Sequence, residues 1–177
     1  VDFSPDGSKL LISQYVSVTD SRIYLLDLKT EEYRLVLGDA DSPSVNLPSR
    51  FAADGNGFYF TTDADANFRR LAYYAIDSGD VTILTEGIDW DVSGLLMSYD
   101  RSRGAFSVNA GGRDQLYLFD PSSQRYKSVS GIPIGRASLG AFSPDNRRLA
   151  ITRDTATSPS DNLTLDVSTD GLDHGAI

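Results

Sequence analysis

Ser138 and His174 come nearest to hydrolytic chemistry in this chain. That chemistry requires a nucleophilic serine, a histidine base and an acid that orients the histidine. The segment "GRASLG" at 135–140 resembles a nucleophile turn, but two residues separate Gly135 from Ser138 where that pattern has one. Strand-forming residues follow Ser138, and His174 lies in the C-terminal segment "GLDHGAI". The sequence therefore predicts no triad and no catalytic residue.

The run "DADAN" at 63–67 spaces its oxygen atoms like the start of a calcium-binding loop. The pattern ends there, because the sixth position is Phe68 in place of glycine and the twelfth is Tyr74 in place of glutamate. The chain has no cysteine, which excludes disulfides and thiolate zinc sites. A solvated loop is therefore favoured over a calcium site, and we predict no metal and no cofactor.

Four residues are candidates for contact with a substrate or a neighbouring domain: Arg69, Arg70, Trp90 and Asn109. Adjacent Arg69 and Arg70 need partners in an acidic chain. Those partners are either nearby carboxylates or the carboxylate or carbonyl group of a bound peptide. Trp90, the only tryptophan, belongs either to the core or to a contact surface. Asn109 precedes two glycines and is explained most simply by a hairpin turn.

The formal net charge of −9 over 177 residues predicts an acidic surface. Such a surface argues against nucleic acid and anionic membranes as partners, because phosphate contacts need clustered lysine and arginine. No apolar run approaches the roughly 20 residues of a membrane helix, and no signal peptide opens the chain. Localisation stays open between the cytoplasm and the periplasm or cell exterior.

An internal repeat supplies the elements that position these residues. Four segments align without gaps: "FSPDGSKLLIS" from Phe3, "FAADGNGFYFT" from Phe51, "MSYDRSRGAFS" from Met97 and "FSPDNRRLAIT" from Phe142. Their spacings of 48, 46 and 45 residues are typical of four-stranded propeller blades. The group "SPDG" has the residues of a type I turn. Arg101 replaces its glycine in the third copy, so that turn either differs or carries roughly 1–2 kcal/mol of strain.

Each unit has a second landmark, an apolar strand that ends in an aspartate: Asp27, Asp77, Asp120 or Asp166. Consecutive apolar residues, as in "LLI" at 10–12 and "FYF" at 58–60, predict strands that are covered on both faces. No window has apolar residues at sustained helical spacing. We therefore predict an all-β chain with almost no helix.

Together these features predict a partial β-propeller of about four consecutive blades, each a four-stranded antiparallel sheet. The units are about 1–45, 46–92, 93–136 and 137–177 of a single segment. The first unit has only three residues before its turn, and the last has no clear outer strand before Ile177. We expect truncation at both ends, a missing true N-terminus, and self-association through uncovered sheets.

The turns and the segments "FRRLAYYAID", "IDWDV", "FSVNAGGRDQLYLFD" and "TSPSDNLTLDV", in this order, resemble the N-terminal β-propeller of the prolyl oligopeptidase family, the S9 serine peptidases. The resemblance covers nearly the whole chain. It implies a non-catalytic propeller that gates the access of peptide substrates to a C-terminal α/β-hydrolase domain of the same polypeptide. None of the family's catalytic residues has a match here, so the resemblance transfers no activity to this chain.

TolB-like propellers share the "SPDG" turn and imply a different function. In that alternative, a propeller without enzymatic activity binds proteins through its loops or its central funnel. The fold does not choose between the two functions. A hydrolase domain downstream in the reading frame distinguishes the peptidase from the binding module.

Overall fold

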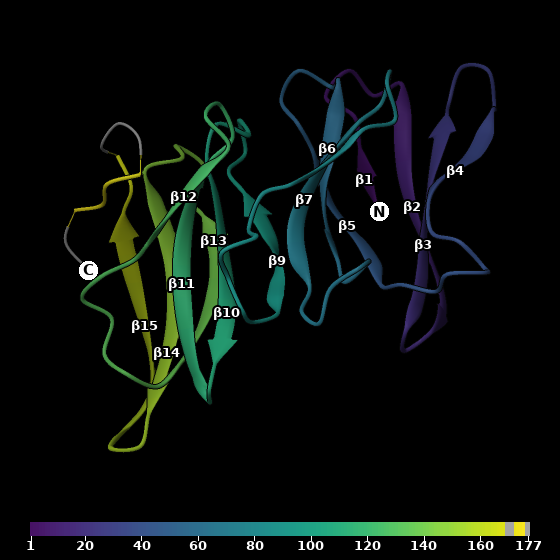
Figure 1. The fold of residues 1–177 in the computed structure, drawn as a ribbon. Coiled ribbons are helices and arrows are strands. Elements are labelled where there is room, and N and C mark those ends of the chain that lie inside the picture. The colour runs from purple at the N-terminus through teal and green to yellow at the C-terminus, as the bar shows by residue number, and fades with distance from the viewer. Residues whose placement is uncertain (169–171, 176–177) are drawn as a thin grey trace. The chain divides into compact units, whose positions relative to one another are not determined.

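The computed structural model describes residues 1–168 and 172–175, and these residues form β-strands and no helix (Figure 1). The strands make four antiparallel sheets, and neighbours within a sheet are neighbours along the chain. Three sheets have four strands, and the fourth has three among the described residues. The predicted all-β, blade-like architecture is thus confirmed. No helix in this part of the chain is long and apolar enough to cross a membrane.

The first two sheets belong to a compact unit over Val1–Leu95. The first sheet consists of β1 (Asp2–Phe3), β2 (Lys9–Ser17), β3 (Asp20–Asp27) and β4 (Tyr33–Leu37). The second consists of β5 (Asn46–Phe51), β6 (Gly57–Thr62), β7 (Arg70–Ala75) and β8 (Val81–Ile83).

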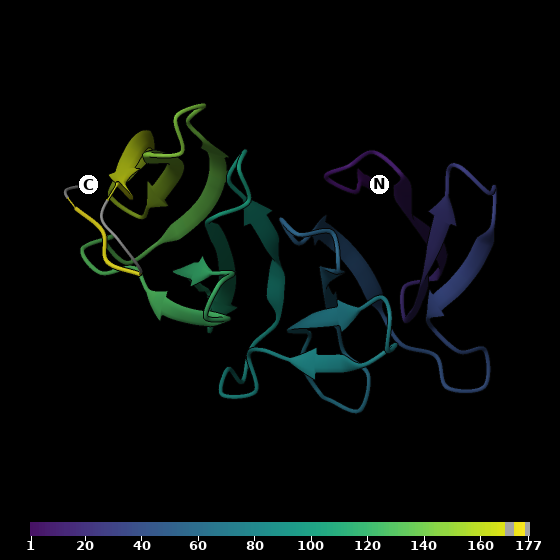
Figure 2. The ribbon, with the colours of Figure 1, turned by 90° about the horizontal axis from the view of Figure 1, so that it is seen from above.

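The other two sheets belong largely to a second compact unit over Leu96–Ile177. The third sheet consists of β9 (Val92–Met97), β10 (Gly104–Ala110), β11 (Arg113–Asp120) and β12 (Arg125–Ser128). The fourth consists of β13 (Arg136–Phe142), β14 (Arg148–Thr155) and β15 (Ser158–Asp166). Figure 2 shows the strands of these sheets from above.

The four repeated turns share one backbone hydrogen bond, from the N–H of the fourth turn residue to the carbonyl oxygen of the first, and the three turns that begin with serine add the same side-chain bonds. In the first, Gly7 N–H donates to Ser4 O at 2.9 Å, and Lys9 N–H donates to Ser4 Oγ at 2.8 Å. Ser4 Oγ in turn donates to Asp6 Oδ1 at 2.6 Å. The fourth turn residue has a positive φ in every copy: 71° at Gly7, 73° at Gly55, 58° at Arg101 and 59° at Asn146. The Arg101 turn is therefore the same turn, and its left-handed residue carries the strain of roughly 1–2 kcal/mol.

Each unit has its own hydrophobic core between two sheets. In the first unit, buried aliphatic residues of the first sheet pack against an aromatic face of the second: Leu11, Ile23 and Leu25 against Phe51, Phe58, Phe60 and Tyr74. In the second unit, the third sheet packs against the fourth: Ala105, Leu116 and Leu118 against Phe142, Leu149 and Leu165. Within each unit, one face of each sheet is thus buried against the other sheet.

The predicted burial of both strand faces is confirmed for residues 58–60 of β6, where all three aromatic side chains are at most 2% exposed. It does not hold at 10–12, because only Leu11 is buried and its two neighbours are partly exposed. Alternate strand residues face opposite sides, so Leu10 and Ile12 share a face with Phe3, Tyr33 and Leu35. These last three are 54%, 53% and 45% exposed. We call this surface the open face of the first sheet.

Candidate functional site

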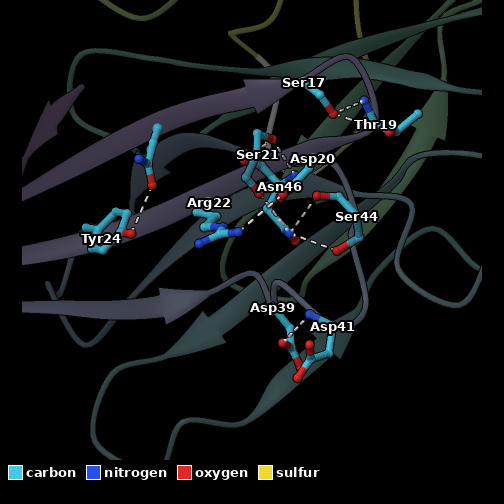
Figure 3. Close-up of polar contacts among 11 residues, drawn as sticks. Ser17, Thr19, Asp20, Ser21, Arg22, Tyr24, Asp39, Asp41, Ser44 and Asn46 are labelled. Atoms are coloured by element: carbon cyan, nitrogen blue, oxygen red, sulfur yellow. Dashed lines mark hydrogen bonds and ion pairs between the residues drawn. The ribbon is translucent and has the colours of Figure 1, made fainter.

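The sheets within each unit are linked where a third strand begins beside the first strand of the next sheet. In the first unit, Asn46 N–H donates to Ser21 Oγ at 2.8 Å, and Ser21 Oγ donates to Asn46 O at 3.0 Å (Figure 3). Asn46 Nδ2 also donates to Ser21 O at 3.2 Å. Both residues are only 3% exposed. This buried pair therefore holds β3 to β5.

Asp114 makes the equivalent link in the second unit. Its Oδ2 accepts hydrogen bonds from Ala137 N–H and Arg136 Nε, each at 2.9 Å, and its Oδ1 accepts one from Asn109 Nδ2 at 2.9 Å. Burial raises the pKa of Asp114, but these bonds outweigh that effect and hold the pKa below its ordinary value of 3.8. The charged carboxylate thus joins β11 to β13 at neutral pH.

Arg69, just before β7, makes a related link to the strand that follows the second sheet. Its N–H donates to Asp91 Oδ1 at 2.7 Å, and its carbonyl oxygen accepts from Val92 N–H at 2.9 Å. The guanidinium lies 3.5 Å from Asp91 Oδ2. Of the two partners predicted for this arginine, the structure shows a nearby carboxylate. The Arg69 side chain is still 32% exposed, so part of the guanidinium stays accessible.

Arg70 and Asn109, two other predicted contact residues, serve their own loops. Arg70 Nη2 donates to Ala64 O at 2.6 Å in the loop between β6 and β7. Asn109 Oδ1 accepts from Gly112 N–H at 3.0 Å, and its amide donates to Asp114, which closes the β10–β11 hairpin. Asn109 is therefore placed as its simplest interpretation predicts. The side chains of Arg70 and Asn109 are thus each bonded within their own loop.

A cleft of about 530 Å³ opens between the first and second sheets, beside the links of the first unit. Its apolar wall comes from Tyr15, Val18, Val45 and Leu47. Its polar wall comes from Asp63, Asn67, Arg69 and Asp91. The volume lies within the range of about 300–1,000 Å³ that is usual for ligand sites. We call it the inter-sheet cleft.

Trp90 lies at the surface and not in the core. Its ring centroid is 6.1 Å from that of Phe68, and the two side chains are 42% and 37% exposed. Phe68 directly precedes Arg69, and Trp90 directly precedes Asp91, so the aromatic pair adjoins the polar wall of the cleft along the chain. Of the predicted contact residues, Arg69 lines the cleft, and Trp90 is the sequence neighbour of the cleft residue Asp91.

His174 is not arranged as a catalytic base. Its Nε2 lies 3.2 Å from Ser130 N, and a backbone N–H can only donate, so Nε2 is the acceptor. The ring proton then sits on Nδ1 and faces Gly175 O at 3.0 Å. Ser138 lies in β13 opposite Thr152. Ser130 Oγ also lies 3.3 Å from His174 Nε2, but Nδ1 of that ring faces a carbonyl oxygen and not a carboxylate. Within residues 1–168 and 172–175, neither Ser130 nor Ser138 therefore belongs to a complete triad.

The calcium-like run at 63–67 also has a structural use. Asp63 Oδ1 accepts a hydrogen bond from Val45 N–H at 2.7 Å, which holds the loop before β7 to the strand entering the second sheet. In the described part of the chain, no group of three histidine, cysteine, aspartate or glutamate side chains could hold a metal ion. A solvated loop, with one carboxylate turned to the backbone, accounts for this segment.

Sequence reasoning missed Ser21, Asn46 and Asp114, and also the cleft residue Asn67. One signal was available, because Ser21 and Asp114 each lie six residues before a landmark aspartate. A polar residue at the same place in two units, just before an apolar strand, indicates a repeated structural contact. Asn67 has no such repeat, and only the three-dimensional structure places it in the cleft.

The blade-like sheets, repeated turns and inter-sheet links define this chain as a β-propeller segment. No family model and no curated protein matches its sequence. Solved structures match its fold. TolB from Acinetobacter baumannii is 20% identical with a TM-score of 0.68, covering 98% of this chain and 42% of that one.

Parts of two peptidase structures share this fold. Prolyl oligopeptidase B from Galerina marginata is 14% identical with a TM-score of 0.78, covering 95% of this chain and 24% of that chain. Dipeptidyl peptidase 4 from Porphyromonas gingivalis is 18% identical with a TM-score of 0.69, covering 91% and 23%. This chain thus spans less than half the length of each of these structures, and the likeness defines the fold they share.

Proposed function

We propose that this chain is a non-catalytic propeller segment of a prolyl oligopeptidase-type serine peptidase. It gates the access of peptides to a C-terminal α/β-hydrolase domain of the same polypeptide. The observation that carries the proposal is the backbone likeness to prolyl oligopeptidase B, whose TM-score of 0.78 exceeds the 0.68 for TolB. A segment whose described residues contain no triad fits a role in which another domain performs the chemistry.

The inter-sheet links suit a gate physically. A size filter must keep its shape when a folded protein presses against it, and buried hydrogen-bonded pairs resist separation because breaking them leaves polar groups unsatisfied. The Ser21–Asn46 pair meets this requirement in the first unit, and Asp114 with Ala137 N–H meets it in the second. Substrates would then be selected by size and by how readily they unfold.

The reading frame gives the first test. The proposal predicts a G-x-S-x-G segment within about 300 residues downstream, followed by an aspartate and then a histidine, as in α/β-hydrolases. An open reading frame without that arrangement would contradict the peptidase role.

The second test uses the full-length polypeptide. It should cleave a short unstructured peptide but not the same sequence within a stably folded protein. Removal of residues 1–177 should abolish this discrimination. Because that deletion could prevent folding, Asp114→Ala serves as a milder variant that weakens one link and should raise cleavage of the larger substrate. Equal cleavage of both substrates by the unaltered protein would refute gating.

A TolB-like binding propeller is the second candidate function. It is supported by sequence identities of 20% and 21% to two TolB structures, against 14% to prolyl oligopeptidase B. In this case the segment recognises proteins and assists no hydrolase. A reading frame that lacks the hydrolase arrangement and encodes further propeller repeats would favour it.

A further inference from the structure

The inter-sheet cleft leaves polar groups unused. Asn67 makes no hydrogen bond or ion pair within the described residues, although it lines the cleft. Arg69 engages Asp91 through its backbone N–H and one guanidinium nitrogen, which leaves other guanidinium N–H groups without a protein partner in this part of the chain. The wall therefore offers an amide that both donates and accepts, beside a cation that donates.

A peptide backbone fits these groups. It presents N–H donors and C=O acceptors in alternation, and an extended segment directs alternate side chains to opposite sides. Tyr15 and Val18, 71% and 80% exposed on the hairpin between β2 and β3, provide apolar surface for such side chains. The cleft volume of about 530 Å³ admits a short segment and excludes a folded domain.

The charges beside the cleft select the kind of peptide. Trp90 is flanked in sequence by Asp89 and Asp91, and all three are exposed. Aromatic faces attract the cations of lysine and arginine, and the Asp91 side chain is 52% exposed and available to a second cation. The positive charge of Arg69 is already balanced by Asp91, and the chain as a whole has a formal net charge of −9. Charge complementarity therefore favours a basic ligand over an acidic one.

We propose that the inter-sheet cleft binds an extended peptide segment carrying a lysine or arginine side chain. The peptide backbone contacts Asn67 and Arg69, and its apolar side chains contact Tyr15 and Val18. The basic side chain lies against the Phe68–Trp90 pair, close to Asp91. A peptidase propeller with this cleft would hold basic, unstructured substrates at its surface before they reach the catalytic domain.

The single tryptophan provides a direct assay, because Trp90 fluorescence reports on this surface alone. The probe is the acetylated and amidated peptide Gly-Ser-Leu-Lys-Leu-Arg-Ser-Gly, titrated into the 177-residue chain. The matched probe has glutamate in place of lysine and arginine. We expect saturable binding of the basic probe, at least tenfold tighter than that of the acidic probe and weaker as salt concentration rises.

Variants locate the binding. Val18→Ser and Asn67→Ala alter exposed side chains outside the inter-sheet links, so their unfolding midpoints should match the wild type while affinity falls at least fivefold. Trp90→Ala, followed by anisotropy of a fluorescein-labelled basic probe, should lower affinity at least tenfold. Tyr99→Ala is the matched control, because Tyr99 is also an exposed aromatic residue, at 71%, in the second unit.

Equal affinity for both probes, or no detectable binding, would overturn the proposal. So would binding that all three cleft variants retain, because that result would reflect general attraction to a negatively charged chain. The proposal rests on the proposed function only in assuming that peptides reach this surface. The assay needs no hydrolase domain, so a failure to bind leaves gating intact, and a reading frame without a hydrolase leaves a binding result intact.

Discussion

Asp114→Ala is the most direct test of the inter-sheet links. The substitution removes the acceptor of three hydrogen bonds, from Ala137 N–H, Arg136 Nε and Asn109 Nδ2. It adds no bulk and lies at the start of β11, outside the hydrophobic core. The expected result is a less stable second unit with an unchanged secondary structure.

The size of the effect follows from the three partners. An unsatisfied, partly buried Ala137 N–H costs about 1–3 kcal/mol. The ion pair with Arg136 contributes about 0–1 kcal/mol, because that side chain is 75% exposed. The exposed Asn109 bond adds about 0.5 kcal/mol. The free energy of unfolding should fall by roughly 1.5–4.5 kcal/mol, which lowers Tm by roughly 3–18 °C for a chain of this length.

Thermal and urea unfolding followed by circular dichroism measure this change. Asp161→Ala is the control, because it also removes an ion pair, to Arg153 at 3.0 Å, but from a side chain that is 53% exposed. It should change stability by less than about 1 kcal/mol. If Asp114→Ala unfolds like the control, the link does not hold the two sheets together, and the argument fails.

Three further predictions concern other surfaces. Hydrogen bonds from the Ser4 hydroxyl and then from Ser8 lower the pKa of Asp6, so the contribution of Asp6 to stability is present above about pH 4 and declines as the pH falls further. The difference in free energy of unfolding between wild type and Asp6→Asn, measured by urea unfolding, should therefore become smaller below about pH 4. Glu31 has a φ of 60°, so Glu31→Gly should raise the free energy of unfolding by about 0.5–1 kcal/mol, whereas Glu32→Gly should not. The open face of the first sheet should cause weak self-association in sedimentation experiments, because burying three half-exposed side chains on each of two copies gives about 6 kcal/mol, close to the lower estimate of the association penalty. Leu35→Lys should abolish it, and sedimentation coefficients of wild type and Leu35→Lys that change identically with concentration would contradict the assignment of this face.

The repeated turns could be predicted from sequence because the hydrogen bonds that close each turn are local. The hydrogen bonds of the first turn lie between Ser4 and Lys9, so residue types at fixed positions determine its shape. The local pattern prevails even where Arg101 replaces glycine, since the same turn forms with a φ of 58°. The strands could also be predicted, because a short apolar run between two such turns is most readily accommodated as a β-strand.

The partner of each link residue and the cleft could not be predicted, because they depend on which sheet edges meet. Ser21 and Asn46 are 25 residues apart, and nothing in either local sequence identifies the other as its partner. In one link the carboxylate is that of Asp114, in the third strand of its sheet, whereas in another it is that of Asp91, in the segment that connects two sheets. No residue type at a fixed place in the repeat therefore identifies a link. Burial of Leu10 and Ile12 likewise depends on a covering neighbour, which a strand pattern does not specify.

The hydrogen bonds within a turn join residues close in sequence, whereas those of the links join residues more than 20 positions apart. This difference sets an order in which the chain can acquire its structure during synthesis. A hairpin closed by its own serine and aspartate can form as soon as about a dozen residues have left the ribosome. The sheet-to-sheet bonds must wait for partners that are 25, 22 and 23 residues further along. Each nascent sheet therefore receives its next neighbour within a few seconds at ordinary translation rates.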